Sequence, residues 1–132
     1  MAVSTFGDAA FAQTFAAAWI NNWNNRDVGA VIAHFTEDCV FESPVAESVV
    51  GEPVIRGKAA LETYWRAALD RIKTLRFTLE TAAWDPTQRT LVVFYVSQIA
   101  ERETRACEAM IFDAAGRQTA GRAYYGYALA AK

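Results

Sequence analysis

The sequence predicts an α+β fold in which three N-terminal helices pack in the concave face of a curved antiparallel sheet. Apolar residues repeat with a helical period of about 3.6 through the first half of the chain. From Leu75 onward the period changes to two, which is typical of strands. Short polar turns separate the later segments, and short turns join antiparallel neighbours. Helices followed by a run of strands indicate an α+β domain.

Length and composition predict one domain that spans residues 1–132. Of the 132 residues, 53% are hydrophobic, which is enough for a single core. The net charge of −2 is spread along the chain and leaves no basic face, so nucleic acid is not an expected partner. Residues 1–20 resemble neither a secretory signal nor a membrane span. We therefore expect a cytoplasmic protein without a membrane partner.

The cysteine and histidine pattern argues against a metal site. Cys39 and Cys107 form no CxxC motif, and His34 is the only histidine. Both cysteines are expected to be reduced and buried. The sequence contains no glycine-rich phosphate loop and no Ser-His-Asp order, so we expect no cofactor.

Two helices are predicted before residue 37. The first spans about six turns and carries one apolar stripe, made of Phe11, Phe15, Ala18, Trp19 and Trp23. Asp27 is a suitable N-cap for the second helix. The apolar positions of that helix are Val28, Val31, Ile32 and Phe35. We expect it to end near Thr36.

A strand, a loop and a third helix are predicted next. Residues 39–43 favour a short strand, because Val40 and Phe41 suit a sheet and Pro44 ends the ladder. Residues 45–56 are interpreted as a loop. The third helix begins after Gly57 and has a clear apolar face, made of Leu61, Tyr64, Trp65, Ala68, Leu69 and Ile72.

The remaining chain predicts an antiparallel meander and a second copy of the chain as partner. After the strand that begins at Leu75, strands are expected at 90–100, 104–112 and 118–129. Residues 91–96 are apolar on both faces, and Cys107, Ala109 and Ile111 extend the outer one. We expect the outer face of the sheet to pack against the same face of a second copy, which would form a homodimer. The alternative is a loop or the N-terminus of the same chain.

Several short segments together carry a family resemblance. They include Arg26-Asp27 and the Phe35–Asp38 and Phe41–Pro44 segments. The other matching positions are Trp19, Trp23, Gly57, Tyr64, Trp65, Glu108, Phe112, Asp113 and Gly116. Over nearly its whole length the chain resembles the SnoaL-like branch of the nuclear transport factor 2-like superfamily, which includes ketosteroid isomerases and polyketide cyclases. The resemblance implies a cone-shaped, cystatin-like α+β roll with a pocket for a small apolar ligand.

The resemblance to ketosteroid isomerases fails at most of the catalytic positions. Their base, a carboxylate just before the proline, is replaced by Ser43. The oxyanion-hole tyrosine matches Trp19, and two supporting tyrosines match Phe35 and Trp65. Only the second acid is retained, as Glu108. If Glu108 faces inward it is either a general acid or base, or an acid with a purely structural hydrogen bond.

The other candidate residues each have a structural alternative. The predicted ligand contacts are Trp19, Trp23, Phe35, Phe41, Ser43, Trp65, Tyr95, Met110 and Tyr125, although aromatic residues at these positions are also typical of a core. Tyr64 belongs to the same possible aromatic slot, and Tyr127 is a third strand tyrosine. Ser43 before Pro44 also suits a turn. His34 is interpreted as a charge near a helix C-terminus rather than as a base in the cavity.

Two functions are compatible with these residues. The first is a cofactor-free isomerase, cyclase or lyase that acts on a small apolar carbonyl or cyclic compound, with Glu108 as the catalytic acid or base and Trp19 or a tyrosine as the hydrogen-bond donor. The second is a non-catalytic, dimeric ligand-binding domain. The missing carboxylate before Pro44 favours the second, and the inward acid favours the first.

Overall fold

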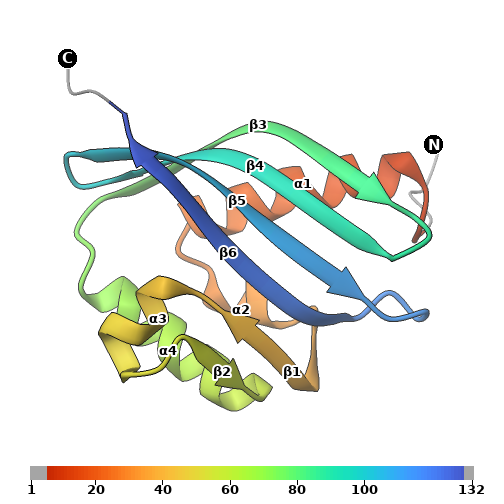
Figure 1. Cartoon of the computed structure of the whole chain (residues 1–132), viewed down its shortest axis with the longest axis horizontal. Coiled ribbons are helices and arrows are strands. Elements are labelled where there is room, and N and C mark those ends of the chain that lie inside the picture. Colours follow the sequence, from red (N-terminus) through yellow and green to blue (C-terminus); the bar gives the residue numbers. More distant parts are fainter. Residues whose placement is uncertain (1–5, 130–132) are drawn as a thin grey trace.

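The computed structural model describes residues 6–129, which form one six-stranded sheet with four helices (Figure 1). The strands are β1 (Phe35–Glu42), β2 (Val54–Arg56), β3 (Leu75–Asp85), β4 (Thr90–Ile99), β5 (Arg102–Phe112) and β6 (Gln118–Ala128). Their order across the sheet is β2-β1-β6-β5-β4-β3. The predicted meander from β3 to β6 is confirmed as antiparallel. The β1–β6 pair is parallel, which the prediction of a purely antiparallel sheet did not include.

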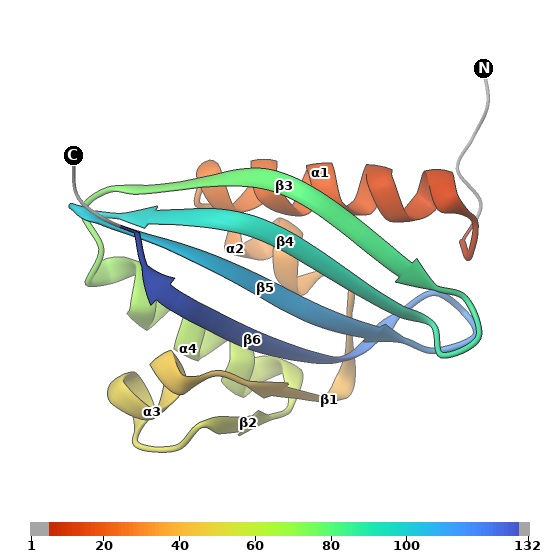
Figure 2. The same ribbon diagram turned by 45° about the horizontal axis from the view of Figure 1, so that its top comes forward.

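The helices pack against one face of the curved sheet, as predicted (Figure 2). They are α1 (Ala9–Asn24), α2 (Val28–Ile32), α3 (Pro44–Val50) and α4 (Lys58–Asp70). Asp8 caps α1 by accepting a hydrogen bond from the Phe11 amide at 2.6 Å. The predicted cap at Asp27 is confirmed by its 3.0 Å bond from the Ala30 amide. With 16 residues, α1 has only about four turns, so the expected six turns are wrong.

The second helix is shorter than its apolar pattern predicts. It ends at Ile32, and Phe35 already belongs to β1. Pairing with β6 causes the change: the Gln118 amide donates to the His34 carbonyl at 2.8 Å, and the Arg117 guanidinium donates to the Phe35 carbonyl at 3.0 Å. Long-range hydrogen bonds therefore override the local helical period. As a result β1 is longer than the strand expected at residues 39–43.

The expected loop at residues 45–56 is wrong, because it contains α3 and β2. Ser43 caps α3, since its hydroxyl accepts a hydrogen bond from the Val45 amide at 3.1 Å. Pro44 occupies the first turn, where its missing N–H costs nothing, and Gly51 ends the helix with φ of 89°. The serine and proline interpreted as a turn are thus a helix start. The strand β2 then pairs antiparallel with β1.

Aromatic rings pack against one another at one end of the interior. Phe6, Phe11, Phe15, Trp84 and Phe112 contact one another with ring centroids 5.0–6.1 Å apart, mostly edge to face. These rings pack this end of the interior closely, and the cavity lined by Trp19 and Trp23 lies toward the other end of α1.

The two cysteines differ in burial. Cys39 is buried on β1 as predicted, with 1% exposure. Cys107 is only half-buried, so the expectation that it is buried is wrong. It lies on the outer face of β5, where nothing in residues 6–129 covers it completely.

The C-terminal end of α1 is fixed to the free edge of the sheet. β3 is an edge strand, and the Asn24 side chain makes two hydrogen bonds with Phe77 of that strand. Its amide nitrogen donates to the Phe77 carbonyl at 2.9 Å, and its amide oxygen accepts from the Phe77 N–H at 2.7 Å. The helix thus satisfies backbone groups that an edge strand leaves unpaired.

We predict that Asn24→Ala lowers the free energy of unfolding by about 1–3 kcal/mol, because two partly buried hydrogen bonds are lost. Denaturant titration measures this change. Asn21→Ala is the matched control: Asn21 is an exposed residue of the same helix, and its variant should differ from the wild type by less than about 0.5 kcal/mol. Equal stability of Asn24→Ala and Asn21→Ala would contradict the prediction.

Candidate functional site

A cavity of about 110 Å³ lies between α1, α4 and the inner face of the sheet. Eight of the residues predicted for the site line it: Trp19, Trp23, Phe41, Ser43, Trp65, Tyr95, Glu108 and Tyr125. Phe35 and Met110 do not. They are 1% and 0% exposed and belong to the core beside the cavity. The structure therefore brings most of the candidate residues around one hollow.

Glu108 is the only acidic side chain among the residues that line this cavity. It lies in the middle of β5 on the inner face, opposite Val93 of β4 and Ala123 of β6. Its side chain is buried, and within residues 6–129 its Oε2 atom has no hydrogen-bond partner. Burial raises the pKa of Glu108 from its ordinary value of 4.5 to about 8. The carboxyl group is therefore mainly protonated at neutral pH and available as a proton donor.

Four hydroxyl groups gather beside Glu108. The hydroxyls of Tyr64 and Tyr125 lie within hydrogen-bonding reach of Ser43, and that of Tyr125 also within reach of Tyr95. Burial raises the pKa of all three tyrosines, and the nearby Glu108 raises each further. They remain protonated and act as neutral hydrogen-bonding groups.

Tyr125 forms part of the cavity rim. The residue as a whole is 42% exposed, whereas burial of its hydroxyl dominates the rise of its pKa. The ring therefore reaches from the surface inward. The hydroxyl lies among Ser43 and Tyr95, which are only 3% and 2% exposed.

Indole and phenyl rings form the apolar wall opposite Glu108. The Trp23 ring meets Trp65 edge to face at 5.2 Å, and Trp19 stacks on Phe77 at 5.8 Å. Trp19 also meets Tyr95 at 5.1 Å. These contacts fix the rings, so the shape of the wall is set by packing rather than by hydrogen bonds.

Apart from Tyr64, which was assigned to the possible aromatic slot, the outer part of the cavity was missed by the sequence prediction. Its additional lining residues are Val45, Tyr64, Ala68, Leu69, Ile72, Leu75, Phe77 and Ile99. The apolar stripe of α4 was recognised, but periodicity does not tell whether a stripe faces other side chains or a hollow. Arg26 holds this region in place, because its guanidinium donates to the carbonyls of Leu69, Ile72 and Lys73 at 3.3, 2.8 and 2.9 Å.

His34 and Tyr127 do not line the cavity. The His34 ring packs against Phe15 at 4.9 Å, near the closely packed end of the interior. Burial and the nearby Arg117 lower the pKa of His34, so the imidazole is neutral near pH 7. The predicted role as a positive charge at a helix end is therefore wrong. Tyr127 is 75% exposed.

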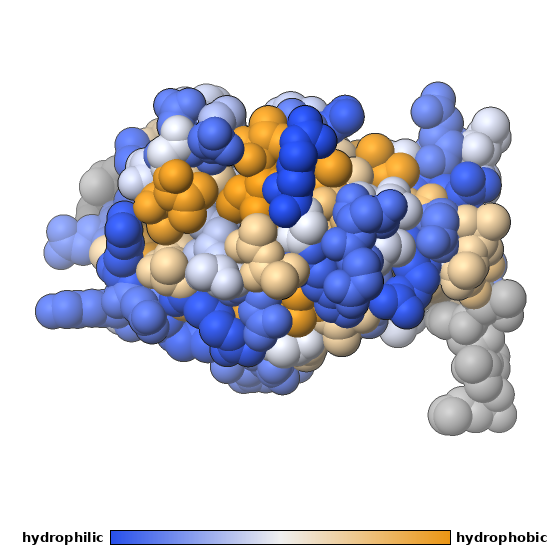
Figure 3. Space-filling model, turned by 90° about the horizontal axis from the view of Figure 1, so that it is seen from below, coloured by the Kyte–Doolittle hydropathy of each residue, from blue (hydrophilic) through white to orange (hydrophobic). Residues whose placement is uncertain are grey.

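A wider groove of about 900 Å³ lies on the other side of Tyr64, between β2 and α4. Apolar residues and charged residues both appear on this part of the surface (Figure 3). None of the buried unpartnered polar atoms of residues 6–129 belongs to this groove, whereas two of the three belong to residues that line the aromatic cavity. The smaller cavity is therefore the better candidate for a specific site.

Residues 6–129 show no arrangement typical of a metal site or of a membrane-spanning helix. No group of three or more His, Cys, Asp or Glu side chains in this part of the chain is arranged to hold a metal ion. No helix there is long and apolar enough to cross a membrane.

The model of the SnoaL-like domain family matches residues 16–123. The chain belongs to this family. A comparison with curated proteins gave no match. This SnoaL-like chain is similar to a SnoaL-like protein of unknown function from Burkholderia thailandensis, with 28% identity and a TM-score of 0.81 over 93% of this chain and 100% of the other.

Two solved structures with lower identity share the fold. One is the epoxide hydrolase/cyclase-like enzyme SalBIII of pyran ring formation in salinomycin, with 17% identity and a TM-score of 0.72 over 91% of this chain and 94% of the other. The second is a steroid delta-isomerase from Pseudomonas aeruginosa, with 19% identity and a TM-score of 0.67 over 88% and 80%. At these identities the likeness establishes the α+β fold alone.

We predict that the burial of Glu108 makes the free energy of unfolding depend on pH. Because the pKa is higher in the folded than in the unfolded chain, the stabilising contribution of the neutral carboxyl is fully present below pH 4.5. It is lost as the pH rises toward 8, with a limiting slope of about 1.4 kcal/mol per pH unit. Denaturant titrations at several pH values measure this slope.

Glu108→Gln provides the matched comparison, because glutamine has the same shape and no charge. As the pH rises from about 5 to 8, the wild type should lose stability relative to Glu108→Gln, because only the wild type has a carboxyl group to ionise at this position. A constant difference across this range would show that Glu108 titrates normally.

Proposed function

We propose that this SnoaL-like domain is a cofactor-free isomerase, cyclase or lyase that acts on a small apolar cyclic or carbonyl compound in the aromatic cavity. Glu108 is the catalytic acid. The observation that carries the proposal is its protonated, buried carboxyl group, whose Oε2 atom has no partner within residues 6–129. A structural acid would be paired or hydrogen-bonded, since an unpartnered buried polar atom destabilises the fold.

The residues of the cavity suit proton donation to an oxygen atom of the ligand. They suit the reaction of ketosteroid isomerases less well, because that reaction uses a carboxylate base just before the proline. The position before Pro44 holds Ser43. Its hydroxyl caps α3 by accepting a hydrogen bond from the Val45 amide N–H. Glu108 donates its proton to a cyclic-ether oxygen as its C–O bond breaks, or to a carbonyl oxygen as its π bond opens. In either case a hydroxyl of the same ligand forms a new bond to that carbon and releases its own proton. The Ser43, Tyr64 and Tyr125 hydroxyls offer a route by which the proton released from the attacking group returns to Glu108.

The size of the cavity limits the ligand. A volume of about 110 Å³ is below the range of about 300–1,000 Å³ typical of drug-sized ligands. The site therefore suits a compact ring or a short chain. Fold likeness to a cyclase-like enzyme and to a steroid isomerase supports a small-molecule reaction, but the residues favour the cyclase or lyase chemistry.

We predict that Glu108→Gln lowers turnover by about 10²–10⁴-fold, because glutamine cannot transfer a proton. The measurement is product analysis by mass spectrometry after incubation with a panel of cyclic ketones, lactones and epoxides. Glu62→Gln is the control, since the Glu62 side chain is exposed on α4, does not line the cavity and pairs with Arg66. Full turnover by folded Glu108→Gln would refute the assignment of the acid.

The second candidate function is a non-catalytic ligand-binding domain. Ser43 favours this function, because it stands where ketosteroid isomerases have their carboxylate base. Glu108 is therefore the only carboxyl group in the cavity lining. Its distinguishing property is binding without turnover. Consumption of any compound of the panel at catalytic protein concentration would exclude it.

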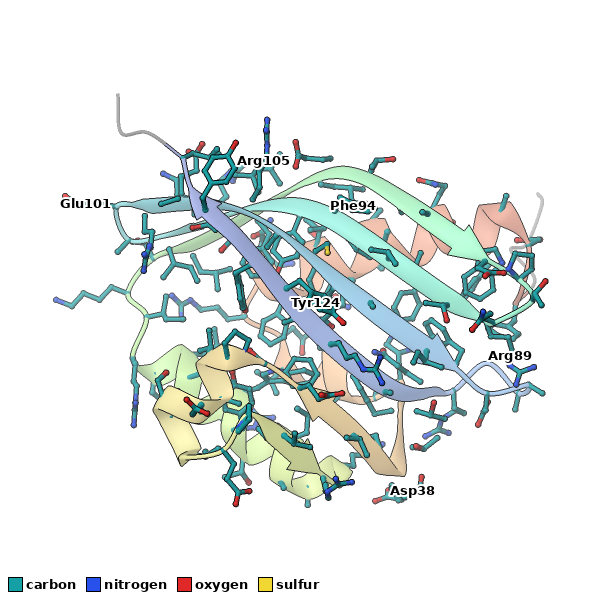
Figure 4. All side chains as sticks on the ribbon, viewed as in Figure 1. Asp38, Arg89, Phe94, Glu101, Arg105 and Tyr124 are labelled. Atoms are coloured by element: carbon teal, nitrogen blue, oxygen red, sulfur yellow. The ribbon has the colours of Figure 1, made fainter. Side chains whose placement is uncertain are left out.

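We also propose that the protein is a homodimer through the outer face of β4, β5 and β6. Phe94, Cys107 and Tyr124 are cross-strand neighbours on this face, and Phe94 and Tyr124 are 38% and 53% exposed (Figure 4). The ion pairs Arg105–Glu80 and Arg122–Glu42 flank this apolar row. A row of large apolar side chains beside charged pairs is typical of an interface between copies.

The dimer proposal predicts that Phe94→Arg converts a dimer into a monomer at micromolar concentration, because a charge would be buried in the interface. Size-exclusion chromatography with light scattering gives the mass. Val50→Lys is the control, since Val50 is 50% exposed on α3, away from this face. A monomeric wild type under these conditions would refute the proposal.

A further inference from the structure

The indole N–H of Trp23 is a second buried polar group of the cavity without a partner. Trp23 lies in the last turn of α1, is 7% exposed and lines the same cavity as Glu108. In the described chain, residues 6–129, no acceptor receives its hydrogen bond. Trp84 shows the opposite case, because its Nε1 donates to the Gly7 carbonyl at 3.1 Å. The fold thus pairs one indole N–H and leaves the other at the cavity wall.

The orientation of the Trp23 ring is fixed by its neighbours. It meets Trp65 at 5.2 Å and 87°, Trp19 at 6.4 Å and 77°, and Phe77 at 6.4 Å and 52°. A phenylalanine at this position would also pack among these rings without burying an unpaired N–H. Packing alone therefore does not explain why the residue is a tryptophan, whereas an acceptor atom of a ligand does.

The charges around the cavity define the ligand class. The lining contains no lysine or arginine, and its only acid is Glu108, which is mainly neutral at pH 7. A charged ligand would lose its hydration without gaining an opposite charge. The indole N–H only donates hydrogen bonds, and a protonated carboxyl also donates. Both unpartnered groups therefore suit the acceptor oxygen of an uncharged molecule.

We propose that the indole N–H of Trp23 is the donor that selects uncharged, oxygen-bearing ring compounds, such as cyclic ketones, lactones or cyclic ethers. The ring must be small, since the site of about 110 Å³ is below the roughly 150 Å³ of an apolar cavity that holds benzene. This inference rests on the proposed function for the location of the ligand. It places the donor at Trp23 rather than at Trp19, because the buried side-chain atoms of residues 6–129 without a hydrogen-bond partner include Nε1 of Trp23 and not that of Trp19.

The test uses cyclohexanone and methylenecyclohexane, which have nearly the same shape but differ in the acceptor oxygen. Binding is followed by two-dimensional ¹H–¹⁵N NMR of the four tryptophan indole groups of the wild-type protein. Cyclohexanone should shift the Trp23 indole N–H signal downfield, and methylenecyclohexane should not. The ketone should bind about tenfold more tightly, as expected for one buried hydrogen bond.

Trp23→Phe should reduce the preference for the ketone to less than about twofold while it retains the binding of methylenecyclohexane. Trp84→Phe is the matched control, because its indole is already paired with Gly7, and it should keep the wild-type preference. The proposal is refuted if the wild type does not prefer the ketone, if the Trp23 signal does not move, or if Trp23→Phe keeps the preference. The wild-type NMR result decides the matter if Trp23→Phe does not fold.

Failure of this inference is separable from failure of the proposed function. If Glu108 is not a catalytic acid, Glu108→Gln retains turnover, while the ketone preference and its loss in Trp23→Phe persist. If Trp23 is not the donor, the preference survives in Trp23→Phe while Glu108→Gln still loses turnover. Cyclohexanecarboxylate and cyclohexylammonium serve as charged probes, and binding of either as tightly as cyclohexanone would overturn the proposed ligand class.

Discussion

The interior of this SnoaL-like domain depends on the packing of flat aromatic rings between α1, α4 and the sheet. At one end, Phe11 meets Phe6 and Phe112 edge to face, and Phe6 and Phe112 contact each other at a tilt. At the other end, Trp19, Trp23 and Trp65 stand around a hollow of about 110 Å³. Rigid rings held by several neighbours do not collapse into such a space, so the hollow is a stable part of the fold.

Two hydrogen-bonding contacts hold the helices that carry these rings. The Asn24 side chain joins the end of α1 to Phe77 on the edge strand β3. Arg26 then donates hydrogen bonds to carbonyl groups in the last turn of α4 and in the segment that follows it. These residues are only two positions apart, so the turn after α1 positions both helical walls of the cavity.

The hollow makes the acid chemistry of Glu108 possible, but it also lowers the stability of the fold. In water a glutamate is ionised at neutral pH, but burial among aromatic rings raises its pKa to about 8. The protonated form then supplies acid chemistry that an exposed carboxylate cannot. Leaving Oε2 and the Trp23 N–H unpaired lowers stability, which is typical of sites arranged for a ligand rather than for the fold.

The sequence alone determined that helices come first and an antiparallel meander follows, and that Glu108 lies on the face of its strand opposite Cys107. These features follow from local periods of 3.6 and two, which the chemistry of neighbouring residues sets. Only the tertiary structure decided where α2 ends, because bonds from Arg117 and Gln118 extend β1 back to Phe35. It also turned Glu108 inward and placed two of the predicted ligand contacts, Phe35 and Met110, in the core beside the cavity. Periodicity defines which face a side chain occupies, but the packing of distant elements decides whether that face meets other atoms or a hollow.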